Sequence, residues 1–556
     1  MFSTPLRSIS STLCSTILQL IVALSLRGGS LARAEVFTAM ADMEALLNAE
    51  RDVVSVIDNY VEAELARLKR LQEFALEYQT RNRDVVKEGV ESISNPVGSY
   101  LFIKRLSTDW GYMESLMRSN NAETFISNIT DTRTHSHVKF PGIEDLSGAA
   151  VALLRLQDTY RLATKDIADG KIDGAKQTKE LSAHDCFELG RVAYKDNDFY
   201  HTLMWMQEAS NREQQENPPT ANRIEILEYL AYAMYQQGNI KHAYNLTKEL
   251  YSLAPDHPRA VGNLQFYQDE LAKQFGPQFS ESIEPLVTES ENETRVKNLR
   301  FDPGNIHQRD MYEALCRGEH PPTPKQESRY TCYYKTDRPF LRIAPLKAEI
   351  QYFKPKIILF RQFITDDEIE LIKTMAFPRL ARATVQDSVT GDNIPATYRI
   401  SKSAWLKPME HEILQSLNRR MDLATNLNMD TAEDFQVANY GIGGHYDPHF
   451  DFARKEETNA FKGLNTGNRI ATLLLYMSNV GAGGATVFPE LKLSLFPSKN
   501  DAVFWFNLLK SGEGDMTTRH AGCPVLSGNK WVSNRWIHEY GQEFRRPCSL
   551  DEQEYE

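Results

Sequence analysis

The N-terminal part of the chain repeats apolar residues every three or four positions. Residues 35–100 include MEALLNAERDVVSVIDNYVEAELARLKRLQEFALEYQTR, with charged residues between the apolar ones. This spacing predicts long amphipathic helices whose apolar stripe needs a partner. We therefore expect a helical N-terminal region over residues 35–140. Coiled-coil-like self-association is the favoured interpretation, and an intramolecular helical hairpin is the alternative.

A second helical pattern covers residues 141–275. The segment YLAYAMYQQGNIKHAYNLTKELYSLAPDHP pairs two helices across a turn, with small Ala residues for the crossing and a Pro at the end. It resembles the tetratricopeptide unit of about 34 residues, of which about two and a half are present. Such arrays present a concave face to extended peptides. Some aromatic side chains here either pack between helices or form a platform for proline-rich peptides, namely Tyr194, Tyr229, Tyr232 and Tyr235.

After an acidic and Pro-rich linker at 276–343, the pattern changes to short β-rich runs. FQVANYGIGG, RIATLLLYMS and DAVFWFNL are examples, separated by Gly, Pro and Asn. Such runs over residues 344–548 predict a jelly-roll or double-stranded β-helix. One helix interrupts them, opened by a capping sequence that begins at Thr365. The expected fold class is multidomain α + β, with a helical dimerisation region, a tetratricopeptide-like peptide-binding domain, a C-terminal barrel and an acidic tail at 549–556.

The first 34 residues have the pattern of a cleaved secretory signal. Arg7 precedes an apolar run at about residues 13–26, and the small-residue pattern Ala32-Arg33-Ala34 follows. The run is shorter than the ~20 residues of a spanning helix, and we expect no membrane span elsewhere. The mature chain then enters an oxidising compartment, where disulfides persist. A net charge of -12 argues against a general nucleic-acid binder.

Cysteines and sequons agree with secretion. One of the six Cys leaves with the signal. Two local pairs are natural, Cys316 with Cys332 and Cys523 with Cys548, which leaves Cys186 odd; other pairings stay open. The glycosylation sequons are at Asn128, Asn245 and Asn292, the second of them within a predicted helix.

Residues 443–453, GGHYDPHFDFA, hold two adjoining His-x-Asp triplets. Residues i and i+2 of a strand point the same way, so His445 with Asp447, or His449 with Asp451, could bind one metal ion. All four share the same parity, so parity cannot choose between the pairs. Pro448 favours the second pair, because Pro usually marks a strand start or an edge.

A third ligand must come from a distant strand, and His520 in TRHAGCPV is the candidate. Two His and one carboxylate on one face of a metal form the facial triad of non-heme iron(II) oxygenases. Ten residues later, Lys530 could bind the far carboxylate of a 2-oxo acid. Tyr440 could add a hydroxyl hydrogen bond. Zinc is the competing metal, but a zinc site would not need a buried Lys.

The chain closely resembles the catalytic α subunits of collagen prolyl 4-hydroxylases. The similarity runs through VANYGIGGHYDPHFDFARK, TGNRIATLLLYMSNVGAGGATVFPE and AVFWFNLLKSGEGDMTTRHAGCPVLSGNKWVSN, and extends to DCFELGRVAY in the repeats. It implies hydroxylation of proline at C4 in X-Pro-Gly repeats of procollagen, using iron(II), 2-oxoglutarate, O2 and ascorbate and releasing succinate and CO2. It also implies the endoplasmic reticulum lumen and an α2β2 tetramer with protein disulfide isomerase. The isomerase would supply the retention signal that the C-terminal DEQEYE lacks.

By this resemblance, the iron ligands are His449, Asp451 and His520, and Lys530 binds 2-oxoglutarate. The first triplet then supplies polar residues near the mouth of the site, and the two local Cys pairs fit the family's disulfides. The resemblance assigns peptide binding to Tyr194, Tyr229, Tyr232, Arg259 and Asn263.

Two groove positions depart from the vertebrate pattern, with Glu228 in place of Asp and Phe266 in place of Tyr. A secretory-pathway prolyl hydroxylase that acts on a non-collagen proline-rich protein is therefore the alternative function.

Overall fold

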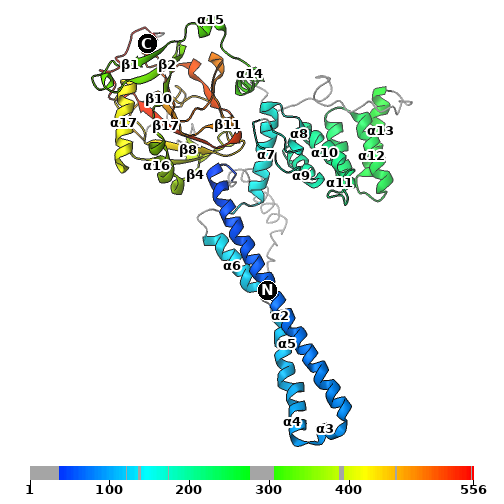
Figure 1. Ribbon diagram of the computed structural model, residues 1–556. Coiled ribbons are helices and arrows are strands. Elements are labelled where there is room, and N and C mark those ends of the chain that lie inside the picture. Colours follow the sequence, from blue (N-terminus) through cyan, green and yellow to red (C-terminus); the bar gives the residue numbers. More distant parts are fainter. Residues whose placement is uncertain are drawn as a thin grey trace, which may run out of the picture. The chain divides into compact units, whose positions relative to one another are not determined.

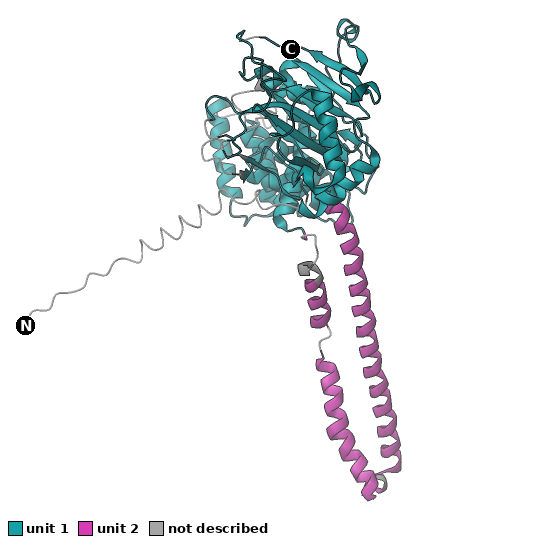
Figure 2. Ribbon diagram, turned by 90° about the vertical axis from the view of Figure 1, so that its left-hand side faces the viewer, with its two compact units in different colours: residues 1–41, 141–556 teal, residues 42–140 magenta. Residues whose placement is uncertain are grey.

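The structure is a computed structural model that describes residues 37–119, 122–135, 140–172, 174–275, 306–386, 393–457, 460–461, 463–551 and 554–555. The predicted signal, the sequon at Asn292 and residues 276–305 of the predicted linker lie outside these ranges. The chain divides into two compact units, residues 42–140 and the remainder, which Figure 2 colours separately. None of the described helices combines the length and apolar character needed to cross a bilayer.

The unit of residues 42–140 is a helical hairpin, in which shorter helices return alongside α2 (Met40–Glu88) (Figure 1). Arg67 Nη1 donates to the Leu116 carbonyl at 3.0 Å, and the Phe74 and Tyr112 rings lie 5.5 Å apart. The helices expected here are confirmed, and the intramolecular hairpin that the sequence pattern left open is present. The returning elements are α3 (Val90–Ser94), α4 (Pro96–Lys104), the π-helix η1 (Arg105–Asp109), α5 (Trp110–Arg118) and α6 (Ala122–His135).

Paired helices form the repeat region. Polar side chains at Ser182, Asp198, Asn222 and Asn239 accept hydrogen bonds from the first turns of four successive helices, which fixes where each helix begins. Successive helices pack around a core centred on Trp205, with Ala where they cross. The helices are α7 (Ile143–Tyr160), α8 (Thr164–Ala168), α9 (Ala183–Lys195), α10 (Phe199–Glu213), α11 (Arg223–Gln236), α12 (Ile240–Leu253) and α13 (Ala260–Phe275).

A buried His joins the first long helix of this region to α10. His201 is 1% exposed, with Nδ1 2.6 Å from Asp198 Oδ2 and Nε2 3.2 Å from Asp158 Oδ1 on α7. Burial by itself lowers the pKa of His201, but the hydrogen bonds to Asp158 and Asp198 outweigh it and raise the pKa to about 9. The imidazolium is therefore a structural cation between two carboxylates.

We expect His201→Gln to lower the free energy of unfolding by about 3 kcal/mol at pH 6, because two carboxylates lose their shared cation. The folded pKa exceeds the ~6.5 of an unfolded His, so this stabilisation is complete below pH ~6.5 and is lost as pH rises through about 9. Urea unfolding between pH 6 and pH 9.5 measures both effects. His184→Gln, an exposed His on α9, is the control. Equal pH profiles for wild type and His201→Gln would contradict the prediction.

The β-rich C-terminal domain predicted from the sequence is confirmed, and its strands pair antiparallel. A nine-stranded sheet has the order β1-β2-β3-β14-β10-β17-β8-β7-β4, and a four-stranded sheet has the order β13-β12-β15-β9. The first sheet contains β1 (Cys332–Lys335), β2 (Leu346–Phe353), β3 (Lys356–Arg361), β14 (Ala502–Phe506), β10 (Arg469–Tyr476), β17 (Lys530–His538), β8 (Phe435–Tyr440), β7 (Lys402–Leu406) and β4 (Ala381–Arg382). The second contains β13 (Leu493–Leu495), β12 (Thr486–Phe488), β15 (His520–Gly522) and β9 (Tyr446–His449). Short pairs join β11 (Val480–Gly483) to β16 (Val525–Gly528) and β5 (Thr384–Gln386) to β6 (Asn393–Pro395).

Side-chain alternation gives the nine-stranded sheet two different faces. On β14, Phe504 and Phe506 join the core formed with α16 (Asp366–Ala376) and α17 (Glu412–Thr425). The intervening Trp505 joins the core on the other face. A capping box at Thr365 opens α16, as its sequence predicts.

The disulfide of the structure differs from the predicted pairs. Cys316, at the end of α14 (Ile306–Cys316), is bonded to Cys523, with their Cα atoms 5.6 Å apart. Cys332 and Cys548 are exposed free thiols, so the predicted pairs Cys316–Cys332 and Cys523–Cys548 are wrong. The reason is tertiary packing, because α14 lies against β12 and β13 and buries its last residue beside the segment after β15. Cys186 is unpaired and buried.

Candidate metal centre

Two strands of the four-stranded sheet bring the predicted metal ligands together. β9 and β15 pair antiparallel, with His449 directly opposite His520. Asp451 follows β9 in a bend, so the chain leaves the strand before the carboxylate. One ligand atom from each of the three side chains lies within 4.8 Å of the others. Residues 71 positions apart thus form one cluster.

Hydrogen bonds fix how both imidazoles face the centre of the cluster. Nδ1 of His449 lies 2.8 Å from the Asp447 carbonyl, and Nδ1 of His520 lies 3.0 Å from the Thr518 carbonyl. Because carbonyls only accept, each Nδ1 carries a proton, and Nε2 is the ring nitrogen left for a metal ion. Those Nε2 atoms lie 3.7 Å and 3.5 Å from Asp451 oxygens.

The charge states suit a cation. Burial lowers the pKa of His449 to about 3, with a further decrease from His520. Burial by itself would raise the pKa of Asp451, but His520 and His449 lower it to about 2. Two imidazole nitrogens and one carboxylate are the donor set that non-heme iron(II) oxygenases use.

Lys530 is a buried basic residue in the same domain as the metal cluster. It begins β17, pairs in register with Tyr440 on β8, and is 3% exposed. Its Nζ lies 5.0 Å from the Tyr440 ring centroid, and no carboxylate among the described residues is within ion-pair distance. Burial lowers the pKa of Lys530 to about 7. A buried ammonium without an acidic partner fits the distal carboxylate of 2-oxoglutarate.

The first His-x-Asp triplet lies outside the cluster. His445 is 3% exposed and its Nε2 is 3.4 Å from Asp447 Oδ1, while the Asp447 side chain is half exposed. His445 precedes β9, after a turn in which Gly443 takes a positive φ of 70°. The register of β9 against β15 shifts between the pairs His449–His520 and Tyr446–Gly522, and this irregularity lies between the two triplets. Residues of equal parity therefore do not share a site. His445 is thus buried, whereas we expected it near the mouth of the site.

Sequence reasoning missed several polar residues around the ligands. Thr472 donates to Asp451 Oδ2 at 2.7 Å, and Arg469 Nη1 donates to the Asp451 carbonyl at 3.3 Å. Arg469 also pairs with Glu433, whose Oε1 lies 2.9 Å from His538 Nε2. The sequence offers one signal, the charged Arg469 that opens the apolar run RIATLLLY. A charged residue at the end of a strand is ordinary, so this signal did not identify Arg469 as part of the site.

Alternate helices of the repeat region carry the predicted groove residues. Tyr194 on α9 lies 4.8 Å from Tyr229 and 5.7 Å from Tyr232 on α11, measured between ring centroids. Arg259, whose side chain is 67% exposed, pairs with Glu228 at 2.8 Å. These three tyrosines are partly exposed.

The row continues beyond the predicted residues. Tyr235 contacts Phe266 on α13, which is 44% exposed, and Asn263 lies on the same helix. The tyrosines pack against each other and still reach solvent, so the geometry allows both the packing and the groove interpretation.

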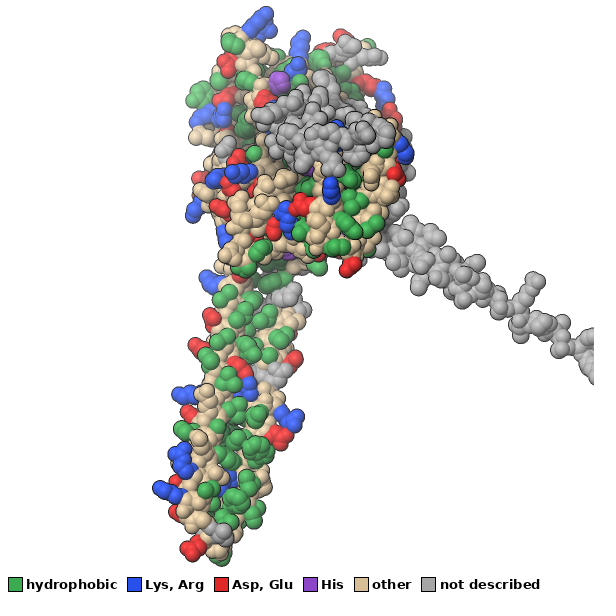
Figure 3. Space-filling model, turned by 90° about the vertical axis from the view of Figure 1, so that its right-hand side faces the viewer, with side chains coloured by type: hydrophobic (Ala, Val, Ile, Leu, Met, Phe, Trp, Pro, Cys, Tyr) green, Lys and Arg blue, Asp and Glu red, His purple; other side chains and the backbone are tan. Residues whose placement is uncertain are grey.

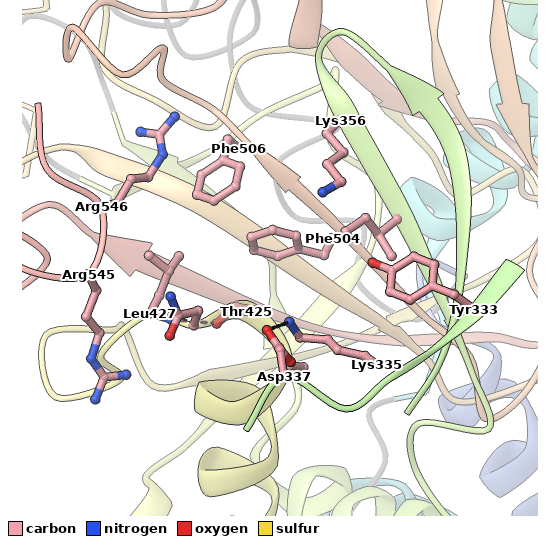
Figure 4. Close-up of a pocket in the computed structure, with 13 residues that line it drawn as sticks. Tyr333, Lys335, Asp337, Lys356, Thr425, Leu427, Phe504, Phe506, Arg545 and Arg546 are labelled. Carbon is pink, nitrogen blue, oxygen red and sulfur yellow. Dashed lines mark hydrogen bonds and ion pairs between the residues drawn. The ribbon is translucent and has the colours of Figure 1, made fainter. Parts of the chain in front are cut away.

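A cavity of about 220 Å³ opens on the other face of the nine-stranded sheet (Figure 4). Phe504 and Phe506 point into it, and Lys356, Arg545 and Arg546 lie around it. Its lining includes none of the predicted site residues. Because the cluster side of β14 is the face of Trp505, whose ring lies 4.9 Å from His520, this cavity is separate from the metal cluster.

Three family models match the chain. They are the N-terminal region of the prolyl 4-hydroxylase alpha subunit at 39–174, the prolyl 4-hydroxylase peptide-substrate-binding domain at 183–273, and the 2OG-Fe(II) oxygenase superfamily at 435–538. The last of these spans the metal cluster and Lys530.

Curated relatives match over nearly the whole chain. Prolyl 4-hydroxylase subunit alpha-2 of Caenorhabditis elegans is 56% identical, over 94% of this chain and 95% of the relative. Prolyl 4-hydroxylase subunit alpha-1 of Homo sapiens is 46% identical, over 94% and 97%. A solved viral collagen prolyl hydroxylase from Paramecium Bursaria Chlorella virus-1 matches 32% of this chain and 94% of its own, with 26% identity and a TM-score of 0.27, which adds nothing to the assignment. Together with the models, the curated relatives show that the chain belongs to the prolyl 4-hydroxylase alpha-subunit family, and that its catalytic domain is a 2-oxoglutarate-dependent, iron(II)-dependent dioxygenase.

Proposed function

We propose that the chain is the catalytic subunit of a procollagen-proline 4-dioxygenase, which hydroxylates proline at C4 in X-Pro-Gly repeats. The observation that carries this is the buried cluster of His449, Asp451 and His520 in the same domain core as Lys530, a buried cation without an acidic partner among the described residues. Family membership supplies the substrate class. The catalytic domain would span 344–548 and the peptide-binding domain 141–275.

Each site residue has a role that follows from its chemistry. His449, Asp451 and His520 hold iron(II), and Lys530 binds the distal carboxylate of 2-oxoglutarate, with Tyr440 beside it. Iron(II) with 2-oxoglutarate and O2 supplies an oxidant for the C4–H bond, and 2-oxoglutarate leaves as succinate and CO2. The chain itself positions the reactants and excludes water. Ascorbate is the expected reductant that keeps iron in the divalent state.

Hydrogen bonds to backbone carbonyls orient the imidazoles of His449 and His520. They restrict the rotation of both imidazoles, so the ligand atoms converge before the ion arrives. Trp505 and Phe488 contact the His520 ring and keep that side of the site apolar. Dry, fixed donors of this kind bind a cation without reorganisation.

Turnover on a (Pro-Pro-Gly) repeat peptide tests the proposal. With iron(II), 2-oxoglutarate and ascorbate, and with co-expressed protein disulfide isomerase, we expect succinate and 4-hydroxyproline in equal amounts, because one oxygen atom enters each product. A matched (Ala-Ala-Gly) peptide should release no more succinate than the reaction without peptide. Absence of hydroxyproline from the Pro-Pro-Gly peptide would overturn the collagen assignment.

The changed groove favours one alternative substrate. By the resemblance to the family, Glu228 and the exposed Phe266 stand where the vertebrate pattern has Asp and Tyr. A secretory-pathway hydroxylase of a non-collagen proline-rich protein would turn over a polyproline peptide in preference to Pro-Pro-Gly repeats. Side-by-side kcat/KM values for the two peptides distinguish these functions.

Self-association through the N-terminal unit is supported by its surface. Apolar side chains remain exposed along the hairpin, and Figure 3 shows them gathered on the visible face of that unit. A second copy could cover them, as in an α2β2 assembly with protein disulfide isomerase. The exposed apolar residues of the hairpin include Leu47, Val54, Ile57, Leu65, Leu76, Leu101 and Trp110.

The endoplasmic reticulum lumen, a cleaved signal and N-glycosylation belong to the same proposal. Asn128 is exposed on α6, which suits a glycan. Asn245 lies on α12, and the Thr247 of its sequon is 1% exposed and bonded to the Ala243 carbonyl. Asn128 is therefore the better-supported acceptor of these two.

A further inference from the structure

Two buried polar side chains hold Asp451 through successive hydrogen bonds. Thr472 Oγ1 on β10 donates to Asp451 Oδ2 at 2.7 Å, and Asn507 Nδ2 donates to Thr472 Oγ1 at 2.9 Å. Thr472 is 1% exposed and Asn507 is fully buried. The sequence places these residues 21 and 56 positions after Asp451, with no motif joining them.

Chemistry fixes which group donates and which group accepts in these two hydrogen bonds. An ionised carboxylate only accepts, so the single hydroxyl proton of Thr472 points to Asp451. The remaining lone pairs of Oγ1 then accept from the Asn507 amide, which must present nitrogen to it. The Asn507 backbone is itself fixed, because its N–H donates to the Ile470 carbonyl at 2.8 Å and its carbonyl accepts from Asp515 N–H at 2.9 Å.

Asp451 and Thr472, which are joined by this hydrogen bond, differ in the rigidity of their backbone. Asp451 lies in a bend after the short strand β9 and has no strand partner among the described residues. Thr472 lies in the middle of the nine-stranded sheet, opposite Trp505 on one side and Trp536 on the other. A β-branched residue in a paired strand has little side-chain freedom. The hydroxyl of Thr472 therefore ties a ligand in irregular backbone to the most ordered part of the domain.

We propose that Thr472, oriented by Asn507, is a positioning residue for the iron(II) ligand Asp451 and sets the affinity of the site for the metal. The proposal rests on the assignment of His449, Asp451 and His520 as iron ligands. Thr472 contacts Asp451 directly, and Asn507 contacts Thr472. Neither residue needs to touch the ion. Partners of this kind typically contribute about 10- to 100-fold to metal affinity.

Metal titration of the apoenzyme tests the proposal without turnover. The full chain, co-expressed with its isomerase partner, is stripped with a chelator and titrated with Mn(II) under electron paramagnetic resonance, where free Mn(II) is counted directly. We expect Thr472→Val, which keeps the shape and removes the hydroxyl, to raise the Kd about 10- to 100-fold. Thr472→Ser keeps the donor and should stay within about threefold of wild type. Asn507→Ala should fall between them, because it frees the hydroxyl without removing it.

Two further measurements make every outcome decisive. Asp451→Ala, titrated in parallel, should lose Mn(II) binding; if it binds normally, the iron assignment fails and not only the role of Thr472. Circular dichroism of the metal-free variants reports folding. Should Thr472→Val not fold, the comparison of Asn507→Ala with wild type decides, and an unchanged Kd there overturns the proposal. A folded Thr472→Val with wild-type Kd overturns it as well.

Discussion

Asp451→Ala is expected to abolish iron-dependent turnover, with kcat/KM falling by more than about 100-fold. Loss of an outer partner of a metal ligand already costs about 10- to 100-fold, and this change removes the only carboxylate of the cluster. His449 and His520, whose ring centroids are 4.4 Å apart, would remain without the anion that offsets a divalent cation. Succinate release at saturating iron(II) measures the loss.

Asp447→Ala is the matched control. It removes an Asp from the neighbouring triplet of the same segment, and that side chain is half exposed and 3.4 Å from His445. Burial lowers the pKa of His445 well below its usual value, so this contact is not an ion pair of two charges. Since even exposed ion pairs contribute only about 0–1 kcal/mol, turnover should stay within about fivefold of wild type. Equal losses for Asp447→Ala and Asp451→Ala would show that the wrong pair is assigned to the metal.

Lys530→Met is expected to raise the KM for 2-oxoglutarate about 10- to 150-fold, since a charge-assisted hydrogen bond contributes about 1.5–3 kcal/mol. The change keeps an unbranched side chain, one atom shorter than that of Lys, and removes its charge. At saturating 2-oxoglutarate, kcat should fall much less than kcat/KM. Lys492→Met, an exposed Lys of the same domain, is the control. An unchanged KM in Lys530→Met would exclude Lys530 from co-substrate binding.

The same Lys gives 2-oxoglutarate binding a pH dependence. Burial lowers the pKa of Lys530 to about 7, and only the ammonium form pairs with a carboxylate. Binding therefore takes up a proton above pH 7 and none well below it. The Kd for 2-oxoglutarate should be flat below pH 6 and rise by about tenfold between pH 6 and pH 8. Calorimetry in two buffers of different ionisation enthalpy measures the uptake, and Lys530→Met should lose it.

Local patterns were enough for most elements of the fold. The capping sequence at Thr365 opens α16 where expected, and the apolar run at 469–476 is a central strand of the large sheet. Both depend on neighbours within a few residues, so the sequence contains the necessary information. The cysteines show the opposite case, because the predicted partners are close in sequence while the bonded pair is separated by 207 positions.

The residues of the site were also identified partly from the sequence and partly from the tertiary structure. Residue chemistry and family resemblance identified His449, Asp451, His520 and Lys530, but parity left the two triplets equivalent. A register shift in the pairing of β9 with β15, between Tyr446 and His449, separates them in the structure. The sequence alone thus determined which side-chain types serve the chemistry and which segments are helix or strand, since these follow from residue type and local spacing. The tertiary structure alone decided which cysteines bond, which His is buried away from the metal, and that Thr472 and Asn507 support Asp451, because those contacts depend on how distant strands pair.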